Sequence, residues 1–229
     1  MESITIIIPV KDEEDGLRYL LGDYQSSSIS NMYNISFIFV IDERTCDSSK
    51  ETASKFSEKV IDQMGTTGKG AAVIQAVSNW KKDPSDFVVF LDADGSYSFD
   101  SVIKIVSELE KGTDVASGTR FLKSKGRPQG MTRFHYFGNR FLSLVSSIRN
   151  RRKISDLCTG LWGFRKDALM TLKIQSSGFD LEAEISGLVR KNSLKHTEVQ
   201  VEWGQRKGGV SKLRSLTDGF IILTRIIRT

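Results

Sequence analysis

Histidine and cysteine are scarce in this chain, and their positions argue against zinc chemistry. The 229 residues include only two histidines, His135 and His196, which do not form the HExxH pattern of zinc hydrolases. The two cysteines, Cys46 and Cys158, lie far apart and match no metal-ligand spacing. We therefore expect both to be reduced thiols, as in a cytosolic protein, and we disfavour a zinc hydrolase.

The sequence also lacks long apolar runs, a leader and a Walker motif. No stretch of about 18 uninterrupted apolar residues occurs, so we expect no segment of it to cross a bilayer. The first three residues carry no basic side chain, and the apolar run after them is too short for a signal peptide. The pattern GxxxxGK(S/T) is missing, which excludes a Walker A loop.

Charge is divided unevenly between the two halves of the chain. Residues 1–117 carry 11 basic and 20 acidic side chains, whereas residues 118–229 carry 22 basic and 8 acidic ones. The halves therefore have net charges of −9 and +14, which give +5 together. Such a change of sign indicates an anionic partner for the second half. Because no nucleic-acid motif accompanies the basic residues, we expect phosphates or anionic lipid headgroups rather than nucleic acid.

Apolar runs and segments of helical spacing alternate along the chain, and no internal repeat or domain linker interrupts them. The expected strands are 4–10, 35–41, 59–62, 86–91, 114–118 and 196–201, with a strand-like segment at 156–165. The expected helices are 13–28, 47–59, 70–80, 99–110, 134–148, 180–191 and 213–229. This order predicts an α/β protein with a doubly wound, mostly parallel sheet flanked by helices.

The last segment, 213–229, has an apolar face and several basic side chains. Its apolar positions are Leu213, Leu216, Phe220, Leu223 and Ile227. A basic amphipathic helix of this kind lies in a membrane interface or packs on the protein core, and both interpretations stay open at this point. The helix ends without a cap, which leaves two alternatives open: a peripheral protein, or a longer natural protein anchored by membrane-spanning segments after residue 229.

Two carboxylates end the most apolar strand. Residues 86–95 read DFVVFLDADG, an unbroken apolar run followed by Asp92 and Asp94. A run of this kind suits a strand that is buried on both faces, and open α/β sheets bind ligands where such strands end. Two hard oxygen ligands suit a divalent cation that also binds water and phosphate. A simple turn is the alternative, because Asp and Gly are common turn residues.

Two further residues, Asp42 and Lys69, also lie where a ligand could bind. Asp42 ends the strand 35–41, where it can contact a nucleotide or remain a solvated strand end. Lys69 lies between two glycines, where the backbone can approach a ligand closely, although a turn before the next helix explains the triplet equally well.

The segments that carry these residues occur in a characteristic order over nearly the whole chain. They are IIIPVKDEED, FVIDERTCDSS, GTTGKGAA, VVFLDADGSY, VASGTRF, FGNRFLS, DLCTGLWGFRK, FDLEAE and RKGGVSKL. The order resembles glycosyltransferase family 2, with the GT-A fold. It is most similar to dolichyl- or polyprenyl-phosphate hexosyltransferases of the dolichol-phosphate mannose synthase type.

This resemblance implies a role for each matching position. Asp92 and Asp94 would hold Mg²⁺ or Mn²⁺ on the donor diphosphate. The catalytic residues would be Asp94, Arg120 and Arg206. The donor, a GDP- or UDP-hexose, would be bound by Pro9, Glu13, Asp42, Lys69, Asp92 and Lys212. The acceptor would be bound by Asp156, Thr159, Arg165 and Ser211, with Glu182 and Glu184 near the sugar.

The implied reaction is the transfer of mannose or glucose to dolichyl or polyprenyl phosphate, with inversion of the anomeric carbon. It would occur at the cytoplasmic face of a membrane, with residues 1–212 as the catalytic domain and 213–229 as an interface helix. Asp12 stands where the family often has Asn, and Glu43-Arg44-Thr45 stand where it has Asp-Gly-Ser, which leaves the base open. The alternatives are a family 2 enzyme that glycosylates a glycan, protein or soluble acceptor, and a non-catalytic nucleotide-sugar-binding scaffold.

Overall fold

The structure, a computed structural model, describes residues 1–122, 126–210, 212 and 215–229. Its centre is a seven-stranded sheet in the order β3-β2-β1-β4-β6-β5-β7. The strands are β1 (Ser3–Val10), β2 (Asn34–Ile41), β3 (Val60–Asp62), β4 (Phe87–Leu91), β5 (Val115–Thr119), β6 (Leu161–Arg165) and β7 (His196–Gln200). Only β6 runs antiparallel to its neighbours among these strand pairs. The predicted doubly wound, mostly parallel sheet is confirmed.

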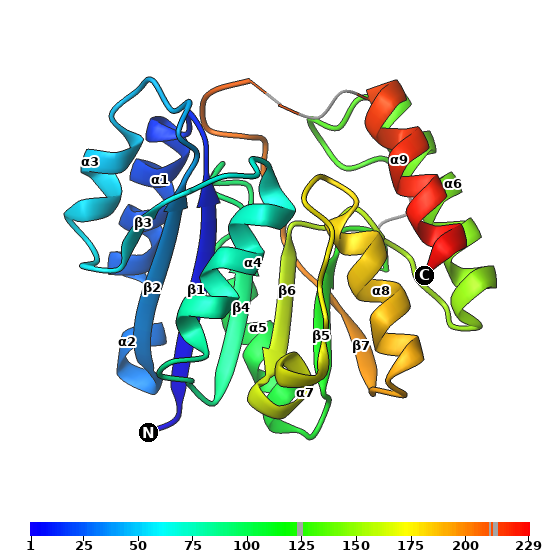
Figure 1. Ribbon diagram of the computed structural model, residues 1–229, viewed down its shortest axis with the longest axis horizontal. Coiled ribbons are helices and arrows are strands. Elements are labelled where there is room, and N and C mark those ends of the chain that lie inside the picture. Colours follow the sequence, from blue (N-terminus) through cyan, green and yellow to red (C-terminus); the bar gives the residue numbers. More distant parts are fainter. Residues whose placement is uncertain (123–125, 211, 213–214) are drawn as a thin grey trace.

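Helices cover both faces of this sheet (Figure 1). They are α1 (Glu14–Ser26), α2 (Ile29–Met32), α3 (Ser49–Ser54), α4 (Lys69–Trp80), α5 (Phe99–Glu110), α6 (Arg133–Asn150), α7 (Lys166–Thr171), α8 (Leu181–Lys191) and α9 (Ser215–Arg228). Alternation along β1 separates the two layers of the core, because successive side chains of a strand point to opposite faces. Ile6 and Ile8 pack with α1, α2, α3 and α5, whereas Ile7 packs with α4, α7 and α8.

Two predicted elements are shorter than expected. The helix expected over 47–59 ends at Ser54, because the chain turns there and the Ser57 hydroxyl donates a hydrogen bond to the carbonyl of Phe37 in β2. The strand-like segment 156–165 is extended only from Leu161, because Asp156 is instead held by Arg120. The short helices α2 and α7 were not predicted from the sequence.

Strand register determines which loops share an edge of the sheet. The parallel pairs β1–β2 and β1–β4 bring the carboxyl ends of three strands to one edge, where Asp42 and Asp92 follow directly. In the antiparallel pair β4–β6, Leu91 faces Leu161, so the residues that precede β6 lie at this same edge. In β5–β7, Thr119 faces Gln200, which adds Arg120 and the segment after β7.

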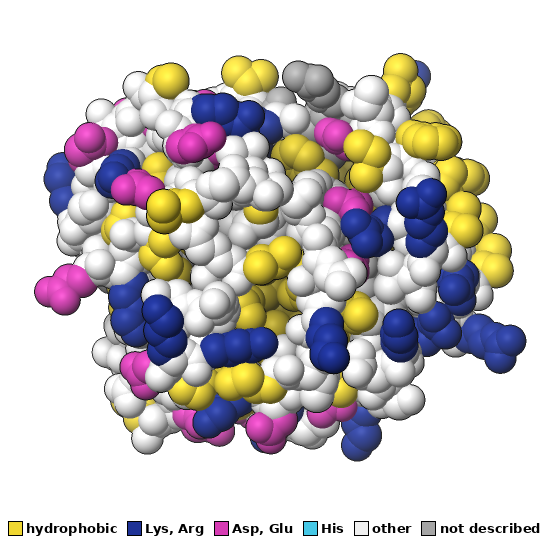
Figure 2. Space-filling view, in the orientation of Figure 1, with side chains coloured by type: hydrophobic (Ala, Val, Ile, Leu, Met, Phe, Trp, Pro, Cys, Tyr) yellow, Lys and Arg dark blue, Asp and Glu magenta, His cyan; other side chains and the backbone are white. Residues whose placement is uncertain are grey.

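Helix α6 has an unusual distribution of side chains. Its buried face is largely polar, with Asn139, Ser143, Ser146 and Asn150. Its exposed face is apolar, with Phe134, Phe137, Phe141, Leu144 and Ile148. Helix α9 packs beside it and exposes Leu216, Phe220, Ile221 and Ile227. Figure 2 shows hydrophobic side chains gathered along the edge of the molecule where α6 and α9 lie, with Lys and Arg side chains below them.

Within the described residues, no helix combines the length and the hydropathy that are needed to cross a bilayer.

Candidate active site

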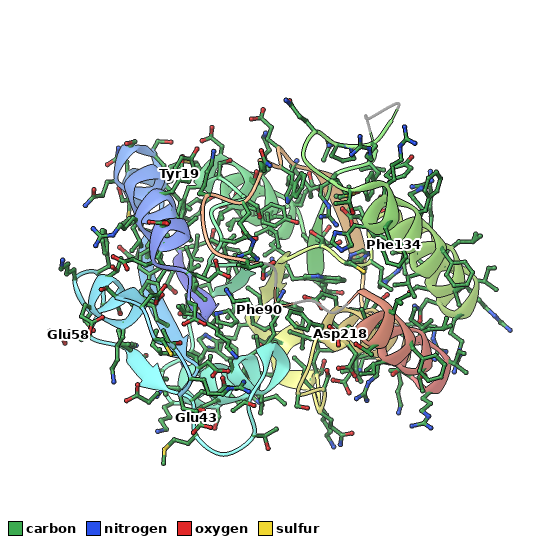
Figure 3. All side chains as sticks on the ribbon, turned by 90° about the horizontal axis from the view of Figure 1, so that it is seen from above. Tyr19, Glu43, Glu58, Phe90, Phe134 and Asp218 are labelled. Atoms are coloured by element: carbon green, nitrogen blue, oxygen red, sulfur yellow. The ribbon has the colours of Figure 1, made fainter. Side chains whose placement is uncertain are left out.

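A cavity of about 530 Å³ opens at the edge of the sheet where β1, β2 and β4 end. Figure 3 looks down on this edge, with Phe90 of β4 labelled near the middle of the view and Asp218 labelled on α9. The predicted site residues that line the cavity are Pro9, Glu13, Asp42, Lys69, Asp92, Asp94, Arg120, Glu182, Arg206 and Lys212. Residues that are up to 203 positions apart in the sequence therefore meet in one space, because Pro9 and Lys212 both line it.

Each of the two predicted metal-binding carboxylates has a cation beside it. Asp92 Oδ1 lies 2.6 Å from Lys69 Nζ, and Asp94 Oδ2 lies 3.2 Å from a terminal nitrogen of Arg206. Lys69 Nζ also lies 2.6 Å from Glu182 Oε1, at the start of α8. Burial alone would lower the pKa of Lys69, but the two carboxylates outweigh it and raise the pKa above its ordinary value. Lys69 is therefore charged, and its two ion pairs connect the start of α4 to the residue after β4 and to the start of α8.

The position of the Asp92 carboxylate depends on Gly160. A Cβ atom at residue 160 would overlap the carboxylate of Asp92. The start of α4 is equally tight, because a Cβ on Gly70 would overlap the carbonyl of Ser176. These two glycines let Asp92 and Lys69 approach each other, as glycine does where backbones and ligands come close. Gly160 was missed in the sequence, although the small residues of DLCTGLWGF are the signal for it.

The segment after β7 closes the cavity from above. Arg206 Nη1 donates hydrogen bonds to both carboxylate oxygens of Glu13, at 2.5 and 2.6 Å. Lys212 Nζ lies 3.0 Å from Glu13 Oε1 and donates a second hydrogen bond to the carbonyl of Asp12. Burial raises the pKa of Glu13, although the two cations oppose that effect. Glu13 therefore anchors the loop that carries Arg206, a predicted catalytic residue, and Lys212, a predicted donor-binding residue.

Asp42 lies on the other side of the cavity and is held by a neighbour. Arg44 donates to its two carboxylate oxygens from Nε and Nη2, at 2.9 and 2.8 Å. These hydrogen bonds are the main reason that the pKa of Asp42 is lowered. Asp42 is thus a charged hydrogen-bond acceptor in the wall of the cavity. Arg44 also lines the cavity, at one of the positions that depart from the family pattern.

Arg120 and Asp156 form a buried ion pair at the back of the cavity. Arg120 Nε and Nη2 donate to the two oxygens of Asp156, each at 2.6 Å, and the Arg120 backbone N–H donates at 3.0 Å. Asn139 of α6 adds a fourth hydrogen bond at 2.6 Å. The guanidinium of Arg120 also stacks on Trp203, with 5.5 Å between its carbon and the ring centroid. This network fixes Arg120 where it faces the cavity.

Asp156 and Thr159 support the cavity and do not line it. The Asp156 side chain is fully buried beneath Arg120. The Thr159 hydroxyl lies 3.2 Å from that of Tyr97, which does line the cavity. Asn139, Tyr97 and Trp203 were missed in the sequence, because their contacts join segments that are far apart along the chain.

Besides Asp156 and Thr159, Arg165 and Glu184 are predicted residues that do not line this cavity. Arg165 faces Phe87 across the β4–β6 pair, which puts it at the opposite edge of the sheet, where it donates to the carbonyl of Leu109. Its placement beside the acceptor pocket is therefore not supported. Glu184 accepts hydrogen bonds from the backbone of Gln175 and Ser176 and pairs with Arg225, which holds α9 against α8. Ser211 lies outside the described residues.

The donor set fits a loosely held divalent cation. Over residues 1–122, 126–210, 212 and 215–229, no group of three or more His, Cys, Asp or Glu side chains could hold a metal ion by itself. Asp92 and Asp94 would therefore supply two oxygen ligands, and a diphosphate and water would supply the others. This is the usual coordination of Mg²⁺ at phosphate-transfer sites.

Comparison with known proteins identifies the family. The glycosyl transferase family 2 profile matches residues 5–173. The chain is 28% identical to glycosyltransferase AglJ of Haloferax volcanii over 228 residues, which cover 99% of this chain and 72% of AglJ. It is 27% identical to the dolichol-phosphate mannosyltransferase of Pyrococcus furiosus over 220 residues, which cover 93% of this chain and 60% of that protein.

A solved structure supports the same fold. Glucosyl-3-phosphoglycerate synthase of Mycobacterium tuberculosis, in complex with Mn²⁺, UDP-glucose and phosphoglyceric acid, superposes with a TM-score of 0.69 at 14% identity. The match covers 99% of this chain and 77% of that one. The sheet, the flanking helices and the cavity at the strand ends agree with the expected GT-A fold. The chain belongs to glycosyl transferase family 2 and is a glycosyltransferase with the GT-A fold.

Proposed function

We propose that this protein transfers a hexose, mannose or glucose, from a nucleoside diphosphate sugar to a polyprenyl phosphate at a membrane face. One observation carries the proposal. Asp218 and Ile222 of α9 line the same cavity as Asp92 and Asp94, while Phe220 and Ile221 of α9 face outward. The donor site and the exposed apolar surface of α6 and α9 therefore adjoin. A lipid acceptor needs this arrangement, with a polar reaction site beside an apolar surface.

The charges of the cavity suit a donor diphosphate. Lys69, Arg206 and Lys212 are cations within it, and charge-assisted hydrogen bonds to phosphate are among the strongest in proteins. A divalent ion bound at Asp92 and Asp94 would neutralise the leaving diphosphate. Arg120, held in place by Asp156, can stabilise charge that moves between the phosphates. We therefore assign the donor to the side of the cavity formed by β1, β2 and β4.

The acceptor chemistry requires no strong base. A phosphate monoester is already an anion near neutral pH, so its oxygen can attack the anomeric carbon directly. In agreement, no histidine lines the described part of the cavity. A single in-line displacement would invert the configuration at that carbon. Of the relatives compared above, the Pyrococcus furiosus protein is named for dolichol phosphate, which supports a lipid acceptor.

The donor and acceptor can be identified with a panel of purified substrates. GDP-mannose, GDP-glucose, UDP-glucose and UDP-mannose would each be offered with Mg²⁺ or Mn²⁺ and a short-chain polyprenyl phosphate. The lipid-linked hexose that forms would be measured. We expect one donor to be strongly preferred and transfer to stop when the metal is chelated. Transfer to 3-phosphoglycerate alone would contradict the lipid acceptor, and nucleotide binding without any transfer would support a scaffold.

The apolar face of α6 is expected to drive attachment to membranes. Replacing Phe137 and Phe141 by Ser should weaken binding to phosphatidylcholine vesicles about tenfold or more, because burying one large apolar side chain contributes roughly 1.5–3 kcal/mol. Both side chains are more than half exposed, so the fold should be unaffected. The matched control replaces the exposed Met32 and Met64 by Ser. Equal vesicle binding by the two double variants would contradict membrane docking through α6.

A further inference from the structure

A second hollow lies beside helix α6. It has a volume of about 500 Å³ and runs between α6 and the segment that returns from its end. Its lining residues are Arg140, Ser143, Leu144, Ser147, Ile148, Arg151, Arg152, Lys153, Ile154 and Ser155. We call this hollow the basic groove. It shares no lining residue with the central cavity, so it is a separate site.

The four cations of the basic groove form no close ion pair with the described residues of the protein. Within the described part of the chain, no carboxylate lies within 4.0 Å of their nitrogens. Arg140 makes a long hydrogen bond, 3.4 Å, to the carbonyl of Ser155 and stacks on Phe121. Arg152 contacts Ser186, and its buried Nε has no hydrogen-bond partner. The carboxylate that acts on Arg152 is Glu198, which also accepts hydrogen bonds from the backbone of Ser155 and Asp156. One carboxylate faces four cations, so the groove keeps a net positive charge that suits an anion.

The groove is also continuous with the apolar face of α6. Leu144 and Ile148 form one of its walls and are 59% and 71% exposed. Arg140 of α6 and the three cations that follow the end of this helix thus lie beside its exposed apolar side chains. An occupant must therefore carry a negative group and lie beside a hydrocarbon phase, which is the chemistry of a lipid headgroup.

We propose that the basic groove binds the phosphate headgroup of an anionic phospholipid in the bilayer on which α6 rests. Arginine suits this ligand because its planar fork donates two hydrogen bonds to one phosphate. The acyl chains would then run beside Leu144 and Ile148. The inference rests on the membrane placement in the proposed function, but it does not depend on the transferase reaction. It gives the strongly basic second half of the chain a specific site.

The test compares two double variants on two kinds of vesicle. Arg151→Asn with Lys153→Gln removes the two exposed cations of the groove, and Asn tolerates the left-handed backbone of residue 151 (φ 49°). Lys55→Gln with Lys81→Gln is the control, since it removes two exposed lysines of equal charge beyond the ends of α3 and α4. Each protein would be floated with phosphatidylcholine vesicles and with vesicles in which phosphatidylglycerol replaces a third of that lipid.

The full chain should bind the phosphatidylglycerol vesicles more tightly. The groove variant should lose about 25-fold in affinity for them, since each basic residue near an anionic surface contributes about fivefold. It should bind phosphatidylcholine vesicles as the unaltered protein does, and the control should lose much less. The proposal is overturned if both double variants lose equally, because then only net charge matters. It is also overturned if the groove variant loses equally on both vesicles.

Failure of the groove can be separated from failure of the proposed function. Hexose transfer to a short-chain, water-soluble polyprenyl phosphate should be unchanged in the groove variant, because neither residue lines the central cavity. If the unaltered protein transfers no hexose but the two variants still differ on anionic vesicles, the reaction is wrong and the groove stands. If the unaltered protein binds neither vesicle, both the membrane placement and the groove are wrong.

Discussion

Replacing Asp94 by Asn is expected to lower kcat for hexose transfer by at least about 10³-fold while the protein stays folded. Asn has the same size as Asp but carries no charge, so it is a poor ligand for a hard cation. The change would also leave Arg206 without the carboxylate that lies 3.2 Å from it. Binding of Mn²⁺ in the presence of nucleoside diphosphate, followed by electron paramagnetic resonance, should weaken in parallel with activity.

The matched control for this variant is Asp62→Asn. Asp62 also lies at the carboxyl end of a strand, β3, but its side chain is exposed and pairs with Lys50. This pair is worth little, as for most exposed ion pairs, so both activity and stability should stay close to those of the unaltered protein. Full metal-dependent activity of Asp94→Asn would remove the Asp92–Asp94 pair from the proposed metal site.

Replacing Arg120 by Met is expected to lower the free energy of unfolding by about 3–5 kcal/mol. The Asp156 carboxylate would lose its counter-charge in a fully buried position, with only the hydrogen bond from Asn139 remaining from its present side-chain partners. The Lys variant should recover little of this loss, because an ammonium cannot reproduce the two parallel hydrogen bonds of a guanidinium. Urea denaturation followed by circular dichroism measures the difference.

Two further variants separate stability from catalysis. In Arg120→Met combined with Asp156→Leu both charges of this ion pair are removed, so stability should largely return while transfer stays lost. In Arg206→Met the altered side chain is only partly buried, so transfer should fall strongly with a small loss of stability. If Arg120→Met were as stable as the unaltered protein, Asp156 would not depend on Arg120 and the structural role would be wrong.

The strands and the carboxylate pair could be predicted because their signals are local. The run Phe87–Leu91 is entirely buried, and a continuous apolar run of that length predicts a buried strand without knowledge of the rest of the chain. Parallel strands then bring their carboxyl ends to one edge, so Asp42 and Asp92 were expected to meet. The motif order added Lys69, Glu182 and Arg206, all of which line the cavity.

Other features could not be predicted because they depend on register and on contacts between distant segments. The direction of β6 puts Gly160 against Asp92 and sends Arg165 to the far edge of the sheet. Burial beneath Arg120 makes Asp156 a support of the cavity wall. The positions of Gly160, Arg165 and Asp156 depend on the antiparallel pairing of β6. No property of residues 156–165 indicates that pairing.

Helix α6 shows most clearly which features are local in the sequence and which depend on tertiary packing. Its spacing predicts an amphipathic helix from the sequence alone, because a period of 3.6 residues is a local property. Which face is buried is a tertiary property, and here Asn139 and Ser143 pack inward while Phe137 and Phe141 face outward. The sequence by itself therefore determined the elements, the family and the carboxylate pair. Only the tertiary structure decided which side chains line the cavity and which form the exposed apolar surface of α6 and α9, because pairing and packing join residues that are far apart in the chain.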